Sequence, residues 1–148
     1  RLDSLNSLLF GLPKYQISRL QKVQNTAARI LTRTKQRDHI SPVLSSLHWL
    51  PVEQRINYKI LILVFKSLHN LAPTYLQDMI TRDTSDRARR TAQLNLLICP
   101  KSKHKYGDRA FSVAGPTLWN NLPAHIRAID DIDKFKTELK THLFNCRS

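Results

Sequence analysis

Positively charged side chains recur every three or four residues near the beginning of the chain. Together with one threonine they would share one face of a helix, and they are Arg19, Lys22, Thr26, Arg29 and Arg33. A row of cations at this spacing can follow the phosphates of a nucleic acid, and the amides of Gln21 and Asn25 would then lie near sugar and base edges. The alternative is a solvated face, but such faces normally mix charges of both signs, and no acidic residue occurs between Lys14 and Arg37. The spacing therefore predicts a nucleic-acid contact along this helix.

A second group of cations falls in two polar stretches later in the chain. It comprises Arg87, Arg89, Arg90, Lys101, Lys103 and Lys105. These stretches have no apolar periodicity, so we expect two exposed basic loops. The loops are candidates for further phosphate contacts, although basic loops can also serve solubility alone.

The overall charge favours the same kind of partner. The chain of 148 residues has 24 Lys/Arg and 11 Asp/Glu, a formal net charge of +13. Residues 1–50 carry 8 basic against 2 acidic residues, and residues 81–109 carry 8 against 3, so these two segments hold most of the excess. A surplus of this size suits a polyanion, and we expect RNA, DNA or an RNA–DNA hybrid. No stretch has the pattern of a signal peptide or membrane span, so a membrane surface is the less favoured partner.

Few residues have the pattern of a catalytic or metal site. The pair Asp130 and Asp131 resembles the adjacent aspartates of polymerases, but magnesium catalysis needs further carboxylates. Asp131 instead stands where the last helix needs an N-cap, with Asp133 in its first turn. The six histidines form no HxxxH pair, no glycine-rich phosphate loop occurs, and Cys99 and Cys146 are too far apart to suggest zinc. We therefore expect no active site, metal or other cofactor in this chain and no small-molecule substrate.

Helical periodicity dominates the chain, which has only three glycines. The pattern predicts helices over residues 13–34, 42–47, 51–69, 73–80 and 131–144, with Ser41 as an N-cap and Asn70 as a left-handed stop. Residues 108–121 would form short helical turns interrupted at Gly115 and Pro116, and residues 94–98 a short extended segment. The expected fold class is all-α, an irregular helical bundle with a central apolar helix, long basic loops and at most a short extended segment.

The apolar positions predict which faces are buried. On the basic helix the expected core face comprises Leu20, Val23, Ala27, Ile30 and Leu31. The helix at 51–69 is apolar nearly all round, so Ile60 and Leu63 should be almost fully buried, with Trp49 anchoring the preceding turn against the same core. On the last helix the core stripe would comprise Ile132, Phe135, Leu139 and Leu143.

The organisation along the chain follows from these elements. We expect a helical bundle over residues 1–80, a basic linker over 81–109 and a helical tail over 110–148 that packs back on the bundle. Met79 is the only methionine, and we expect the chain to be a piece of a longer protein. The scarcity of cysteines indicates a reducing, intracellular compartment and leaves nucleus and cytoplasm as alternatives.

Several phrases together resemble the C-terminal part of a reverse transcriptase from a LINE-type, jockey-like non-LTR retrotransposon. They are "RLDSLNSLLFGLP", "LQKVQNTAARILTRT", "DHISPVLSSLHWLPVEQRINYKILILVFKSLHNLAPTYL", "YGDRAFSVAGPTLWNNLP" and "FKTELKTHLF". The resemblance covers essentially the whole chain in the family's order. One departure is Ser4-Leu5, where the family usually has Tyr-Cys.

The resemblance implies a non-catalytic piece of an RNA-directed DNA polymerase. In that family the segment is similar to the thumb and the tail beyond it, which hold the RNA template and the growing DNA. The polymerase aspartates are absent from this chain, so magnesium would be expected only in the palm, and the missing polymerase domains would be partners. The alternative is a repurposed fragment that acts as a protein-interaction module with a basic, soluble surface.

Overall fold

The computed structural model describes residues 9–84, 95–101 and 110–146. Within these ranges the fold is all-α, an irregular helical bundle without a strand, and the only extended pairing is one antiparallel bridge between Arg82 and Leu97. The helices are α1 (Lys14–Thr32), α2 (Ile40–Ser46), α3 (Val52–Leu68), α4 (Thr74–Gln77), α6 (Phe111–Asn120), α7 (Ala124–Arg127) and α8 (Ile132–Asn145). The fold class predicted from the sequence is therefore confirmed.

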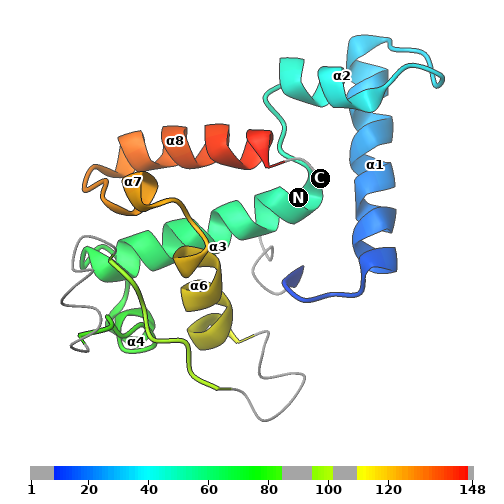
Figure 1. The fold of residues 1–148 in the computed structure, drawn as a ribbon. Helices are drawn as coiled ribbons and strands as arrows, with labels where there is room; N and C mark the ends of the chain where they lie inside the picture. Colours follow the sequence, from blue (N-terminus) through cyan, green and yellow to red (C-terminus); the bar gives the residue numbers. More distant parts are fainter. Residues whose placement is uncertain (1–8, 85–94, 102–109, 147–148) are drawn as a thin grey trace.

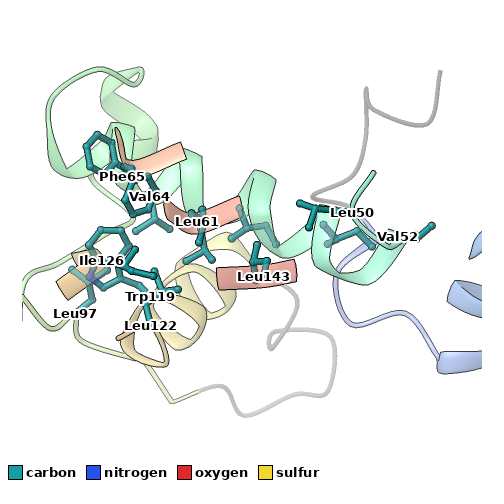
Figure 2. Packing of buried hydrophobic residues seen from close by; sticks show 14 residues of the cluster. Leu50, Val52, Leu61, Val64, Phe65, Leu97, Trp119, Leu122, Ile126 and Leu143 are labelled. Atoms are coloured by element: carbon teal, nitrogen blue, oxygen red, sulfur yellow. The ribbon is translucent and has the colours of Figure 1, made fainter. Parts of the chain in front are cut away.

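Helix α3 is the centre of the bundle (Figure 1). Helices α6 and α8 pack on it, α8 runs antiparallel to it, and α1 touches only the part near its start. A single hydrophobic cluster joins α3 with Leu97 and the helices after it, so the tail residues contribute directly to the central core (Figure 2). Helices α1 and α2 pair with each other beside this body.

The two positions of α3 that were predicted to be buried differ in the structure. Ile60 is 2% exposed, as expected, but Leu63 is only half-buried, so that part of the prediction is wrong. The helices on either side of α3 cover an arc centred on Ile60 and Val64, and this arc reaches Leu61 and Phe65. Leu63 lies at the margin of that arc.

The two tryptophans have different roles. Trp49 is half-buried and lies outside the core cluster, so the expectation that it anchors the core is wrong. Trp119 on α6 is 1% exposed, and its Nε1 donates a hydrogen bond to the carbonyl of Asn95 at 2.8 Å. Leu97 is buried in the same region, where the side chain of Asn120 bonds both its N–H and its carbonyl at 2.9 and 2.8 Å.

Helix α6 is continuous where a break was expected. It passes through Gly115 and Pro116, both of which are buried. A Cβ atom at position 115 would lie 2.8 Å from a methyl carbon of Val64, so glycine permits the close approach of α6 to α3. Pro116 lies in the second turn and removes only one backbone donor, a loss that this packing tolerates.

Left-handed residues end three of the helices. Arg33, His48 and Asn70 have φ values of 53°, 53° and 58°, and Asn70 is the stop predicted from the sequence. After α2 the N–H of Trp49 bonds the carbonyl of Leu44 and that of His48 bonds Ser45, which is the Schellman arrangement. Helix α2 itself begins at Ile40, so Ser41 is not its N-cap as predicted.

The last helix begins with the predicted cap. The carboxylate of Asp131 accepts a hydrogen bond of 2.7 Å from the N–H of Lys134, and Asp133 lies in the first turn, where it pairs with Lys136 at 2.9 Å. The interpretation of Asp131 as a helix cap is confirmed.

Removal of this cap should destabilise the chain measurably. We expect Asp131→Ala to lower the free energy of unfolding by about 0.5–2 kcal/mol. Asp131→Asn should lose only the charge term of about 0.3–1 kcal/mol, since its oxygen can accept the same bond. Urea denaturation followed by circular dichroism measures both. The exposed neighbour provides the control, because Asp130→Ala should change stability by less than about 0.5 kcal/mol; equal losses at both positions would contradict the capping account.

Candidate nucleic-acid interface

Two glutamines fasten α1 to the start of α3. Gln24 is 4% exposed, and its Nε2 donates to the carbonyl of Leu50 at 2.9 Å. The Oε1 of Gln21 accepts a hydrogen bond of 2.8 Å from the N–H of Val52, while its Nε2 donates to Gln24 and Asn25 at 2.9 and 2.8 Å. The expectation that the Gln21 and Asn25 amides reach base edges is therefore wrong for Gln21, whose amide is fully engaged within the protein.

The apolar side of α1 is less covered than the pattern predicted. Only Gln24 and Ala28 are buried on this helix, whereas Val23, Ile30 and Leu31 are 60%, 72% and 65% exposed. The prediction that these three belong to the core is wrong. The reason is the position of α1 at the edge of the bundle, where α2 and the start of α3 cover a narrow strip of its surface.

The outer side of α1 presents the predicted row of cations. Arg19, Lys22 and Arg33 are exposed, and Thr26 between them bonds the Lys22 carbonyl through its hydroxyl at 3.0 Å. Arg33 is the left-handed residue that ends the helix, so its side chain leaves from the first residue of the following loop. The row runs from Arg19 to the end of the helix at Arg33, and no acidic residue interrupts it.

Arg29 makes hydrogen bonds within the protein, unlike the exposed cations Arg19 and Lys22 on the same helix. Its guanidinium donates hydrogen bonds to the carbonyls of Lys35 and Asp38, the latter at 2.9 Å, and it is half-buried. These bonds tie the loop between α1 and α2 to the helix. Arg29 also lines a shallow hollow on α1, together with Lys22, Asn25, Thr26, Ile30, Thr34 and Gln36. Arg29 thus positions the loop while it also lines the hollow.

Arg127 is another basic residue whose side chain bonds within the protein. It is buried, its Nη1 donates to the carbonyl of Asn120 at 2.9 Å, and burial lowers the pKa of its guanidinium. This bond links α7 to the end of α6. This cation contributes to the net charge without being available to a partner.

The second predicted group of cations is mostly outside the described part of the chain. Lys101 is described and is exposed. The other five lie outside the described residues, and they are Arg87, Arg89, Arg90, Lys103 and Lys105. Within the described residues, the predicted cations that can be examined as an interface are those of the α1 surface and Lys101.

A further basic surface escaped the sequence analysis. His48 and Trp49 of the turn before α3 lie with Tyr58 and Lys59 of α3 and Lys140 of α8 around one hollow. Three separate segments contribute these residues, so no spacing in the sequence brings them together. The available signal was the adjacent aromatic residue and cation on α3, Tyr58 and Lys59.

The described residues hold no group of three His, Cys, Asp or Glu side chains that could bind a metal ion. None of the helices in the described ranges is long and apolar enough to cross a membrane. No protein-family model, curated protein or solved structure matches the chain.

Proposed function

We propose that the chain is a non-catalytic nucleic-acid-binding module that clamps RNA template and primer duplex. The observation that carries the proposal is the outer side of α1, where Arg19, Lys22 and Arg33 are exposed in a row without an acidic neighbour on the helix. Cations at helical spacing can contact successive phosphates and release the counterions bound to them. The net charge of +13 supports the same partner.

The resemblance to the LINE-type reverse transcriptases supports a more specific form of the proposal. The chain would be the thumb and C-terminal part of a retrotransposon RNA-directed DNA polymerase, acting inside the cell beside the polymerase domains of its parent protein. Catalysis and magnesium would then belong to the palm of that parent. The present chain would hold the duplex and perform no chemistry itself.

A salt titration tests the proposal. We expect Arg19→Gln and Lys22→Gln each to weaken binding of a labelled RNA–DNA hybrid, and each lost phosphate contact should reduce the slope of log affinity against log salt by about 0.7–0.9. Fluorescence anisotropy of the hybrid measures both quantities. Lys134→Gln provides the matched control, because it removes one exposed charge on α8 outside the hollows described above.

Arg29→Ala belongs in a separate test, since it should loosen the loop over residues 33–39 as well as remove a charge. Unchanged affinity and salt slope in the Arg19→Gln/Lys22→Gln double variant would remove α1 from the binding surface. No salt-dependent binding by the unaltered chain would remove the proposed function.

One observation favours the second candidate function, a protein-interaction module. Val23, Ile30 and Leu31 expose apolar side chains on α1, as surfaces that bind other proteins often do. Serine at these three positions separates the candidates. Retained hybrid binding by this triple variant supports the nucleic-acid role of the cations, whereas the interaction module predicts loss of a protein partner and indifference to nucleic acid.

A further inference from the structure

A basic groove lined with aromatic rings lies between the α2–α3 turn, α3 and α8. It consists of two adjoining hollows that share His48, Tyr58 and Lys140. Trp49 and Lys59 line the first hollow, and Phe144 lines the second. No acidic residue lines either hollow within the described chain.

The cations around the groove are unequal. Lys136 also faces the second hollow, but its ammonium pairs with Asp133 at 2.9 Å, so its charge is partly compensated. Arg55 of α3 lines the first hollow and is half-buried. Lys59 is exposed and Lys140 is half-buried, and they come from α3 and α8 on the two sides of the groove. Two ammonium groups on opposite walls suit an extended polyanion that passes between them.

The aromatic rings supply the other half of a nucleotide site. Tyr58 and Phe144 pack one side against the hydrophobic core and are only partly buried. Trp49 is half-buried outside the core, and His48 is exposed. Rings held in this way offer faces on which unpaired bases can stack, and stacking is available to any base sequence.

His48 occupies a backbone conformation that argues for a role of its side chain. Its φ of 53° is left-handed, at the position of the Schellman turn that glycine usually fills. A histidine there costs conformational energy that glycine would avoid. The imidazole nevertheless lines both hollows of the groove.

We infer that this groove binds a single-stranded segment of nucleic acid, with unpaired bases stacked on Trp49 and Tyr58 and phosphates held by Lys59 and Lys140. The inference rests on the proposed function, since it assigns a second contact to a chain that binds duplex through α1. The groove lies beside α1, because Leu50 of the groove accepts a hydrogen bond from Gln24 on the buried side of that helix.

The first test uses a labelled oligouridylate of about 12 nucleotides and a blunt RNA–DNA hybrid as separate probes. Trp49→Ala should weaken binding of the single strand by about 5- to 100-fold, the range expected for loss of one stacked base. Trp49→Phe should retain most of the affinity, and both variants should bind the hybrid as the unaltered chain does. The oligouridylate should also quench the fluorescence of Trp49, because Trp119 is buried in the core, and Trp49→Phe should abolish this quenching.

The second test changes Lys140 and His48, which lie outside the hydrophobic core cluster. Lys140→Gln should weaken binding of the oligouridylate, whereas Lys134→Gln on the same helix should not. His48→Gly should raise the midpoint of thermal unfolding, because glycine relieves the left-handed backbone, and should weaken single-strand binding at the same time. A histidine with only a structural role would give the first effect without the second.

The possible outcomes separate this inference from the proposed function. If Trp49→Ala and Lys140→Gln both bind the oligouridylate as the unaltered chain does, the groove is not a single-strand site. If the Arg19→Gln/Lys22→Gln variant nevertheless loses hybrid binding, the proposed α1 interface is retained. Absence of binding to either probe by the unaltered chain would overturn both. An oligodeoxythymidylate of the same length distinguishes RNA from DNA as the single strand, and equal affinity for the two assigns recognition to bases and phosphates alone.

Discussion

Replacing Phe135 with alanine should lower the free energy of unfolding by about 3–5 kcal/mol, the range for removal of a buried aromatic ring. Phe135 is fully buried on α8. Its ring stacks on Phe65 of α3, with centroids 4.4 Å apart, and lies 5.8 Å from the ring of Trp119 of α6. The substitution would therefore leave a cavity at the point where three helices meet.

Urea denaturation followed by circular dichroism measures the loss. Phe135→Leu is the matched control, because it keeps the site apolar and leaves a smaller cavity, so it should cost less than alanine. A loss below about 1 kcal/mol for Phe135→Ala would be that of a surface site. Such a result would mean that α8 does not pack on α3 as described.

Phe135 also shows which part of the fold the sequence can predict. The stripe of Ile132, Phe135, Leu139 and Leu143 predicted the buried side of α8, and the last three are buried. The prediction succeeded because α8 has a single apolar side with polar residues around it, and α3 covers that side. An amphipathic helix in contact with the body of the bundle leaves little choice of orientation.

Helix α1 shows the opposite case. Its boundaries were predicted within two residues, yet Val23, Ile30 and Leu31 are exposed and Gln24 is buried. An apolar stripe indicates a side that gains by burial, but it does not say whether another element is long enough to cover it. Gln24 is buried because a backbone carbonyl of the turn before α3 needs its donor, and that partner lies 26 residues away in the sequence.

In the candidate interface, too, some features could be predicted from the sequence and others could not. The exposure of Arg19 and Lys22 follows from the charge pattern of one helix, so the sequence could predict it. The bonds of Arg29 to the following loop depend on how that loop returns to the helix, and the aromatic groove depends on α8 lying beside α3. Features assembled from several segments require the tertiary structure, because no local period encodes them.

A second large effect distinguishes two neighbouring positions on α3. Ile60→Ala should lower the free energy of unfolding by about 2–5 kcal/mol through lost packing and a residual cavity. Leu63→Ala should cost about 1 kcal/mol, because a half-buried side chain loses only part of the 1.5–3 kcal/mol gained on full burial. Both variants delete similar aliphatic groups from one helix, so the difference in their denaturation midpoints measures burial directly.

The same pair tests whether the surface around Leu63 is complete in this chain. The sequence pattern marks Leu63 as a core position, and the bundle leaves it half-covered. If Leu63→Ala costs as much as Ile60→Ala in the 148-residue chain, the arc buried on α3 is wider than described. If Leu63→Ala is mild in this chain but severe when the chain is fused to the polymerase domains proposed as its partners, those domains cover Leu63. The position would then belong to a domain interface, which explains why an apolar residue is found at the margin of the core.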